Sequence, residues 1–311
     1  PFENDPDAKH LASDRTFAFY PIPSCLRDGT VYLLPPMENA LSDDYLFRLL
    51  DGEERDGLFV SHVEPTPFTG GPWNKAHQHG GAVSALMARV LGRLDSPTPM
   101  RLTRLTLEMF RGVPLTPLRV EARVIRGGKR IQSSEATIFD GETPVARATA
   151  LRVRETNGLA ELVVGGSIDP AVTPPPEVIP AFEARPGFEI PGYIHACEIV
   201  PNQDLVAGEY STFWAKLRCR VFAGEEPTGI ERLAAVVDFA SGAGNAMDYT
   251  RFSSINPDLT VHILMEPRSD WIAIRGRTLR AIDGIGMSHA TIHDLKGPIA
   301  EASASLLLGE R

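Results

Sequence analysis

The sequence is poor in cysteine and has no long apolar run. Three cysteines, Cys25, Cys197 and Cys219, occur in 311 residues, widely spaced and odd in number. This pattern predicts reduced thiols in a cytoplasmic protein rather than a disulfide framework or a zinc site. No stretch approaches the roughly 18–20 apolar residues that span a bilayer, and the opening residues PFENDPD do not resemble a signal peptide. We therefore expect a soluble, cytoplasmic protein with no membrane partner.

An excess of basic residues is also missing. The chain has 31 Lys and Arg against 40 Asp and Glu, a formal net charge of −9. Because proteins meet nucleic-acid phosphates with an excess of Lys and Arg, a nucleic-acid partner is not expected. A local basic patch for a phosphorylated small molecule remains compatible with this balance. The length suits two domains or one duplicated unit with a sizeable core.

Several catalytic signatures are absent. The chain has no Gly-x-Ser-x-Gly nucleophile elbow, no Gly-x-Gly-x-x-Gly, no phosphate-binding loop and no paired-cysteine motif. None of the three cysteines lies in a recognisable nucleophile motif. An enzyme with this sequence is therefore expected to use activated water, with no covalent intermediate and no nucleotide or other cofactor.

What the sequence does contain is an internal repeat. Residues 134–140 (SEATIFD) return as residues 288–294 (SHATIHD), and residues 144–150 (PVARATA) return as residues 298–304 (PIAEASA), both 154 positions later. The same register continues back without a gap to Leu105 and Thr106, which match Leu259 and Thr260. An ungapped match of this length predicts a tandem duplication. Differences between the two copies then indicate which of them carries chemistry.

The composition divides the chain into four parts. We expect an N-terminal extension over residues 1–41, a first unit over 42–156, a Pro-rich linker over 157–200 and a second unit over 201–311. Each unit shows a strand, one long helix and a run of half-buried strands, which bury their apolar faces most simply when the sheet wraps the helix. The strands of the two units are expected to join into one sheet, because this leaves fewer exposed edges.

The individual elements follow from the spacing of apolar residues. Helices are expected over 43–50, 81–94 and 229–242. Strands are expected over 57–63, 105–110, 118–125, 133–139 and 144–153 in the first unit, and over 210–222, 259–264, 271–279, 287–294 and 299–308 in the second.

The start of the first long helix is rich in glycine. Residues 68–73 (FTGGPW) are followed by Gln78, His79, Gly80 and Gly81. Backbone amides at a helix start, with glycines that allow close approach, hold a carbonyl oxygen or a phosphate. Equally, the glycines could serve only a tight turn of the loop. His77 and His79 lack a third ligand type nearby, so we favour structural or substrate-edge roles over a metal site for them.

The second long helix differs from the first by a carboxylate. Asp238 lies inside the otherwise apolar run LAAVVDFA, whereas the first helix, residues 82–94, has no acid. A carboxyl group in apolar surroundings is expected to have a raised pKa, which makes Asp238 a candidate general base or water-positioning group. The alternative is a structural role, as an internal cap or a bond to a neighbouring loop.

On these features the chain resembles the double-hotdog acyl-CoA thioesterases of the thioesterase II (TesB)-like group. The resemblance spans about residues 45–308. It rests on residues 71–73 (GPW) with 78–81 (QHGG), on 237–239 (VDF), on 255–262 (INPDLTVH) and on 294–299 (DLKGPI). It implies an α+β tandem hotdog fold, each half a curved antiparallel sheet wrapped around one helix. It also implies a cytoplasmic enzyme of fatty acid metabolism that assembles as a homo-oligomer.

The resemblance also implies site residues. In this family an Asp on the second helix, a Thr or Ser hydroxyl near the following strand and a Gln on the last strand hold the attacking water. Asp238 matches the first, and Ser254 and Thr260 are both candidates for the second. The Gln position falls at Ala304, where Ser303 and Ser305 are the neighbouring polar groups. His79, Gly80, Gly81 and Trp73 are expected on the substrate side.

Three functions fit these observations. The first is an acyl-CoA thioesterase in which Asp238 orients or deprotonates water and amides of a helix start hold the oxyanion. The second is a weakly active or non-catalytic protein that binds acyl thioesters, which Ala304 favours. The third is a purely structural duplicated domain, which the acid inside the second helix disfavours.

Overall fold

The computed structural model describes residues 44–162, 172, 175, 191–201 and 206–311. The expected extension over residues 1–41 lies outside this part of the chain, as do Cys25 and most of the range 157–200. The limits of the predicted domains therefore remain a prediction. Residues 191–201, at the end of the expected linker, form a short helix and a strand that joins the sheet of the second half.

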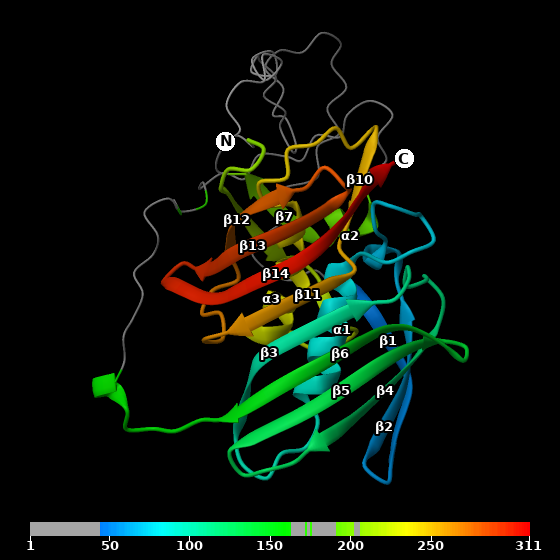
Figure 1. Cartoon of the computed structure of the whole chain (residues 1–311). Helices are drawn as coiled ribbons and strands as arrows, with labels where there is room; N and C mark the ends of the chain where they lie inside the picture. Colours follow the sequence, from blue (N-terminus) through cyan, green and yellow to red (C-terminus); the bar gives the residue numbers. More distant parts are fainter. Residues whose placement is uncertain (1–43, 163–171, 173–174, 176–190, 202–205) are drawn as a thin grey trace, which may run out of the picture.

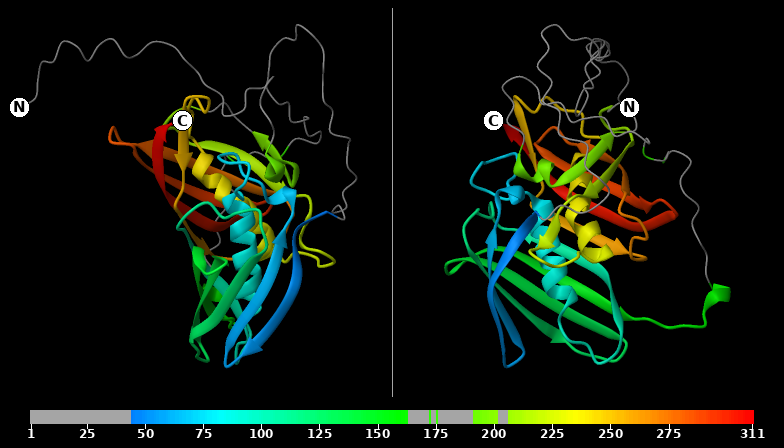
Figure 2. Two further views of the ribbon diagram at one scale, coloured as in Figure 1. Left: turned by 90° about the vertical axis from the view of Figure 1, so that its right-hand side faces the viewer. Right: turned by 180° about the vertical axis from the view of Figure 1, so that it is seen from behind.

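The described residues form one large sheet that curves around two helices (Figures 1 and 2). The sheet has fourteen strands: thirteen are ordered β7-β8-β12-β13-β14-β11-β3-β6-β5-β4-β2-β1-β9, and β10 pairs with β14 beside this path. Their bounds are β1 Tyr45–Arg55, β2 Leu58–Pro65, β3 Met100–Met109, β4 Leu118–Arg126, β5 Ile131–Asp140, β6 Thr143–Arg154, β7 Cys197–Pro201, β8 Ser211–Leu217, β9 Arg220–Phe222, β10 Phe252–Ile255, β11 Asp258–Ile263, β12 Ile272–Arg280, β13 Ile285–Asp294 and β14 Gly297–Glu310.

The two long helices lie inside the curve of the sheet (Figure 1). The two long ones are α1 (Gly80–Gly92) and α3 (Gly229–Val237), and the short ones are α2 (Gly192–His195) and the 3-10 helices η2 (Pro67–Thr69), η3 (Ala160–Leu162) and η4 (Asp238–Gly242). The side chain of His79 caps α1, whereas a capping box of Thr228 and Glu231 starts α3. Almost every residue of α1 is buried, because the sheet covers one side and α3 covers another.

The core is continuous between the two halves. Its largest fully buried side chains come from both long helices and from strands of both halves, including Leu86, Met87, Leu107, Ile138 and Leu233. Along the strands, buried residues alternate with exposed ones, so each strand turns one face to the helices and one to solvent. The tandem hotdog architecture expected from the sequence is confirmed.

The two halves meet where β3 pairs with β11. In this antiparallel pair Thr106 stands opposite Thr260, with Leu105 opposite Val261 and Leu107 opposite Leu259. Of these pairs, Thr106 and Thr260 are matching residues of the repeat, and they face each other across the junction. A pseudo-two-fold axis passes between Thr106 and Thr260, and the expected joining of the two sheets is confirmed.

Three of the expected elements differ from the structure. The helix expected over residues 229–242 ends at Val237, and residues 238–242 form the 3-10 helix η4. The helix expected over residues 43–50 is wrong, because this segment starts β1, which pairs with β2 and is parallel to β9. Local apolar spacing suggested a helix, but burial of Leu46 and Phe47 against the core favours the strand. The strand expected over 210–222 is broken into β8 and β9, because β9 leaves the second half to pair with β1. Strands β7 and β10 were not anticipated.

Candidate active site

The predicted site residues of the two helices come together where α1 begins and α3 ends. His79 caps α1, and Asp238 is the C-cap of α3 and the first residue of η4. The opposite ends of the same helices approach through Arg89 and Glu231, so the helices run antiparallel side by side. This antiparallel packing places the start of α1, from the first half, next to the Asp238 carboxylate at the end of α3, from the second half.

Asp238 is buried, and hydrogen-bond donors surround its carboxylate. Its side chain is 5% exposed, His79 Nδ1 lies 3.1 Å from Oδ2, and Asn256 Nδ2 donates to Oδ1 at 2.8 Å. Burial by itself raises the pKa of a carboxyl group. Here the hydrogen bond and the charge of His79, the Asn256 amide and the Gly81 amide outweigh burial and hold the pKa of Asp238 below its ordinary value. The raised pKa expected from the sequence is therefore wrong, and the group is a carboxylate.

The Nδ1 atom of His79 couples the histidine to this carboxylate. It lies 3.0 Å from the amide nitrogen of Gly81 and 3.1 Å from Asp238 Oδ2. If Nδ1 carries a proton, it donates to Asp238, and the Gly81 amide donates to the carboxylate instead. If Nδ1 carries no proton, it accepts a hydrogen bond from the Gly81 amide. His79 Nδ1 therefore lies within hydrogen-bonding distance of both the helix start and the carboxylate.

The glycine pair makes the close approach of the helices possible. A Cβ atom at Gly80 would lie 2.6 Å from Asp238 Oδ1, and one at Gly81 would lie 2.4 Å from the carbonyl oxygen of Ala235. Real Cβ contacts are not this short, so a side chain at Gly81 would displace the backbone of α3, and one at Gly80 would displace the Asp238 carboxylate or α3. The glycines thus allow tight packing, and that packing places the helix start against the carboxylate. That amides of this helix start hold a carbonyl oxygen stays a prediction.

Aromatic rings enclose His79. Its imidazole stacks on Tyr193 at a centroid distance of 4.5 Å and an interplanar angle of 16°, and the Phe239 ring lies 5.1 Å away. Tyr193 comes from α2, within the range expected to be linker, and its hydroxyl donates to the carbonyl of Ala235 at 2.5 Å. The sequence analysis missed Tyr193, since a single Tyr in a Pro-rich range has no periodic signal.

Asn256 was also missed, although it belongs to one of the stretches that carry the resemblance. Beside it, Asn245 Nδ2 donates to Ser254 Oγ at 3.0 Å, and Tyr249 donates to the Asn245 carbonyl at 3.3 Å. Ser254 and Asn245 are buried. A second polar pair thus lies on β10 and on the loop that follows η4.

Comparison with known proteins identifies the family of this chain. Residues 69–153 match the acyl-CoA thioesterase N-terminal domain, and residues 172–307 match the acyl-CoA thioesterase C-terminal domain. Together these matches cover most of the chain. The chain belongs to the acyl-CoA thioesterase family. The resemblance stated from the sequence is confirmed, and thioester hydrolysis is the general activity of this family.

Several solved structures share the fold of this chain. A hot dog fold protein from Alicyclobacillus acidocaldarius is 14% identical, with 83% of this chain and 96% of that chain covered and a TM-score of 0.65. A putative thioesterase II from Thermobifida fusca YX is 14% identical, with 88% and 100% covered and a TM-score of 0.62. Acyl-CoA thioesterase II TesB2 from Mycobacterium marinum is 12% identical, with 84% and 96% covered and a TM-score of 0.59. No curated protein sequence matches the chain.

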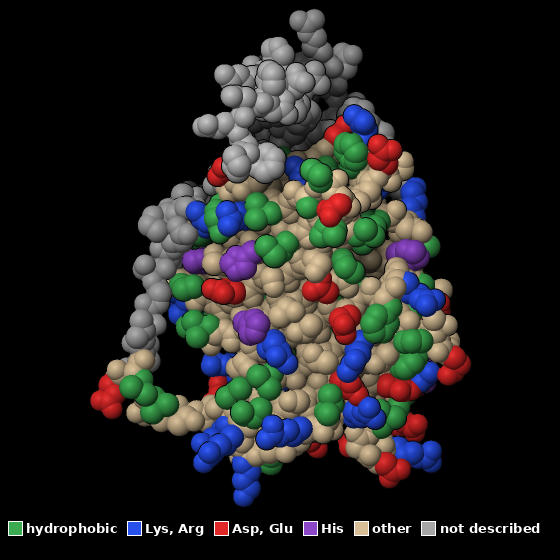
Figure 3. All heavy atoms as spheres, viewed as in Figure 1, with side chains coloured by type: hydrophobic (Ala, Val, Ile, Leu, Met, Phe, Trp, Pro, Cys, Tyr) green, Lys and Arg blue, Asp and Glu red, His purple; other side chains and the backbone are tan. Residues whose placement is uncertain are grey.

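In this thioesterase the other predicted polar residues lie on the outer face of the sheet. Thr260 alternates with buried Leu259 and Val261, and its hydroxyl contacts that of Thr106 at 3.3 Å. Ser303 and Ser305 are exposed, whereas Ala304 between them is buried on the helix side. The structure therefore does not bring Thr260, Ser303 or Ser305 to the Asp238 carboxylate. Figure 3 views this outer face, on which charged and hydrophobic side chains both lie.

Trp73 and His77 lie on the loop that leads to α1. The Trp73 ring is 6.0 Å from the Tyr249 ring, and the Arg311 guanidinium lies 5.4 Å from its centre. The C-terminal residue and the glycine-rich loop therefore meet beside the polar pair of Asn245 and Ser254. His77 lies close to Gly112, where a Cβ atom would be 2.1 Å from its Nδ1.

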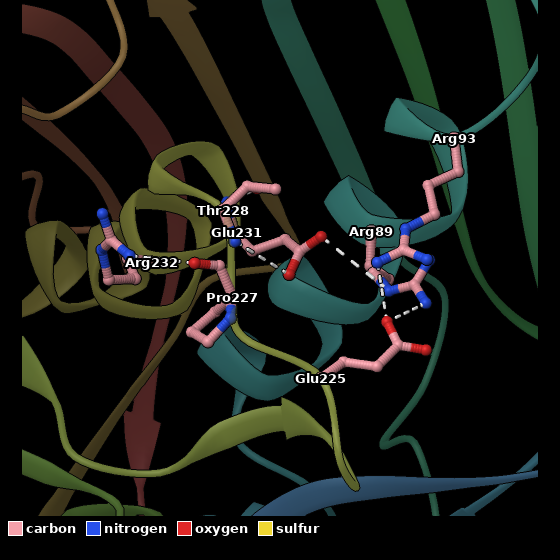
Figure 4. Close-up of polar contacts among 7 residues, drawn as sticks. All are labelled: Arg89, Arg93, Glu225, Pro227, Thr228, Glu231 and Arg232. Carbon is pink, nitrogen blue, oxygen red and sulfur yellow. Dashed lines mark hydrogen bonds and ion pairs between the residues drawn. The ribbon is translucent and has the colours of Figure 1, made fainter. Parts of the chain in front are cut away.

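The opposite ends of α1 and α3 carry ion pairs instead of a catalytic arrangement (Figure 4). Counted from the starts of the two helices, Arg89 occupies the position of Asp238. Arg89 pairs with Glu225 and lies 3.9 Å from Glu231, and Arg93 pairs with Glu225 at 2.6 Å. Burial lowers the pKa of Arg89 and raises that of Glu231. In this thioesterase the pseudo-symmetric counterpart of the Asp238 site is thus filled by charged side chains.

Within the part of the chain that the structure describes, no helix has the length and apolar character needed to span a bilayer.

Proposed function

We propose that this chain hydrolyses acyl-CoA thioesters to a free acid and CoA, with the pair of Asp238 and His79 as its reactive centre. The observation that carries the proposal is the buried Asp238 carboxylate, held as an anion against the start of α1 by His79, Asn256 and the Gly81 amide. A buried anion with oriented donors, next to a helix start, is suited to hold water for attack on a carbonyl group.

The reaction has four steps. The carboxylate of Asp238 orients a water molecule, whose oxygen attacks the thioester carbonyl carbon. The proton of the water passes to the pair of Asp238 and His79. The carbon–sulfur bond then breaks, and the CoA thiolate leaves and takes up that proton. The products are the free acid and the CoA thiol, and no covalent enzyme intermediate forms.

We assign the start of α1 as the part of the site that binds the oxyanion formed from the thioester carbonyl. The Gly81 amide already points at His79 Nδ1 and Asp238, so we assign the Gly80 amide as the donor to the carbonyl oxygen. A helix N-terminus adds a partial positive charge at this place. His79, Gly81 and Trp73 border the substrate on the same side. Of the two candidate hydroxyls we assign Ser254, which is buried with Asn245, rather than Thr260.

A weakly active acyl thioester-binding protein is the second candidate. It is favoured by Ala304, a buried methyl group at the position where the family pattern places Gln. Loss of one polar group that stabilises a transition state commonly costs on the order of 10²–10³ in rate. This candidate predicts binding of acyl-CoA with little turnover. As finer proposals from the family, we expect a cytoplasmic homo-oligomer acting in fatty acid metabolism.

The experiment measures thiol release from a panel of acyl-CoAs by the wild type, by Asp238→Asn and by Asp283→Asn. Asp283 is an exposed acid outside the site and serves as the matched control. We expect hydrolysis by the wild type and the control, and a loss of at least about 10²-fold in Asp238→Asn. Equal rates in all three proteins would remove Asp238 from the mechanism. Acyl-CoA-dependent thermal stabilisation without thiol release from the wild type would support the binding protein.

A further inference from the structure

Tyr193 touches both helices whose ends build the site. It is fully buried, and its ring stacks on His79, the cap of α1. Its hydroxyl donates to the carbonyl of Ala235 in α3, one turn before Asp238. One side chain thus contacts the histidine on one helix and the backbone beside the aspartate on the other.

The stack restricts the His79 ring. Rotation of the His79 ring about its side-chain bonds would take Nδ1 away from Asp238. Tyr193 lies nearly parallel to the imidazole, and Phe239 lies at 57° to it. The two aromatic rings therefore leave the imidazole an orientation in which Nδ1 faces the Gly81 amide and the carboxylate.

The hydroxyl fixes the tyrosine itself. It lies where a Cβ atom at Gly81 would be 2.7 Å away, so it also occupies the space left by that glycine between the helices. Burial, the neighbouring thiols Cys197 and Cys219 and the charge of Asp238 raise the pKa of Tyr193 well above its usual range. The hydroxyl is therefore a protonated donor to Ala235 near neutral pH.

The backbone of α2 places this ring. The amide of Tyr193 donates to the carbonyl of Gly70 at 3.0 Å, and a Cβ atom at Gly192 would be 1.8 Å from the carbonyl oxygen of Pro67. α2 is therefore seated on the loop that leads to α1. Residues of α2, from the range expected to be linker, thus complete a site that lies between α1 and α3.

We propose that Tyr193 is a positioning residue that sets the orientation of the His79 ring toward Asp238 through its stack, and that its bond to Ala235 holds the stack in place. The proposal rests on the proposed function for its kinetic consequence, but its structural content concerns His79 alone. Tyr193 does not contact the reacting atoms and acts through His79.

The test compares Tyr193→Leu, Tyr193→Phe and Phe47→Leu. Tyr193→Leu removes the stack, Tyr193→Phe keeps the ring but removes the hydroxyl, and Phe47→Leu removes an equally buried ring on β1, where it packs on Phe222. We expect Tyr193→Leu to lower kcat by roughly 10–100-fold with KM changed less than about twofold, since small misplacements of a reactive group cost rate rather than binding. Tyr193→Phe, which keeps the stack but loses the bond that holds it, should lower kcat measurably but less than Tyr193→Leu does, and Phe47→Leu should lower Tm with kcat unchanged per folded molecule.

A second readout does not depend on activity. An NMR cross-peak between a His79 ring proton and the Gly81 amide proton, assigned by comparison with His79→Gln, reports the ring orientation in which Nδ1 faces Gly81. The cross-peak should persist in Tyr193→Phe and Phe47→Leu and be lost in Tyr193→Leu. If Tyr193→Leu keeps this cross-peak, or lowers kcat only as much as Phe47→Leu does, the positioning role is overturned. If the wild type hydrolyses no acyl-CoA, the proposed function fails, and the NMR result alone decides the role of Tyr193.

Discussion

Thr106 and Thr260 are matching residues of the repeat, and they stand opposite each other with their hydroxyl oxygens 3.3 Å apart. A residue can meet its own repeat partner in this way only where the pseudo-two-fold axis passes. Both side chains alternate with buried leucine and valine, so both hydroxyls lie on the outer face of the sheet. Asp238 lies on the inner side, between the helices.

The two faces distinguish Ser254 from Thr260, the two hydroxyls that the family pattern left as candidates for the partner of Asp238. Thr260→Val should leave kcat within about twofold of the wild type, since no site group contacts Thr260. Ser254→Ala removes the group to which Asn245 donates and leaves that buried amide without its acceptor. We expect Ser254→Ala to lower kcat by about tenfold or more, measured by thiol release. A larger loss in Thr260→Val than in Ser254→Ala would reverse the assignment.

Gly80→Ala tests the close approach of the helix start to the carboxylate. Its Cβ atom would fall 2.6 Å from Asp238 Oδ1, so α1 and α3 must separate or the carboxylate must turn. We expect kcat to fall by about 10² or more, together with a lower Tm. Gly92→Ala in the same helix is the control, because nothing lies within 4 Å of a Cβ there. It should be neutral or stabilising, since Ala has the higher helix propensity. Equal activity in both variants would contradict the geometry.

Asn256→Leu tests how the pKa of Asp238 is set. Burial favours the neutral acid, and donors including the Asn256 amide outweigh it, so the pKa is below its ordinary value. Removing one donor must raise this pKa. Activity that needs the carboxylate disappears as the pH falls through the folded-state pKa, so the acid limb of the kcat profile should move to higher pH in Asn256→Leu. Asn74→Ala on the exposed loop serves as control, and an unmoved acid limb would argue against the bond between Asn256 and Asp238.

A lowered carboxyl pKa also makes the stability of the fold depend on pH at a second residue, Asp294. Asp294 is fully buried, and Arg268 donates to it through its side chain and its backbone amide, as does the Lys296 amide. Burial raises the pKa of Asp294, but these donors outweigh it and lower the pKa. A depressed folded-state pKa stabilises the fold above the unfolded-state pKa, and this contribution is lost as the pH falls through the folded-state value.

Asp294→Asn should therefore lower the free energy of unfolding near neutral pH by roughly 1.5–3 kcal/mol, the range for hydrogen bonds to charged groups. It should also flatten the acid dependence of stability, measured by urea unfolding between acidic and neutral pH. Asp140→Asn, at the matching position of the first half, is the control because Asp140 is exposed. A steeper acid dependence in Asp294→Asn than in the wild type would contradict the pairing.

Periodicity and the repeat predicted most of the architecture. The two long helices and most of the strands follow from the spacing of apolar residues, since each packs one face on a common core. The segment that became β1 was mistaken for a helix, because its strand form depends on pairing with β2 and with β9 from the other half. The pKa of Asp238 was expected in the wrong direction for a related reason. The apolar run around it is visible in the sequence, but the donors that outweigh burial come from distant segments.

The sequence alone determined that the chain is duplicated, that its family is that of the acyl-CoA thioesterases, and that an acid in the second helix distinguishes the copies. These properties are local in the chain or repeat along it. Tertiary structure alone decided that His79, Asn256 and Tyr193 gather around Asp238, and that Thr260 lies on the other face of the sheet. The four residues of this cluster are separated in the sequence. They meet only because α1 and α3 pack antiparallel within one sheet, with Gly80 and Gly81 allowing the close contact.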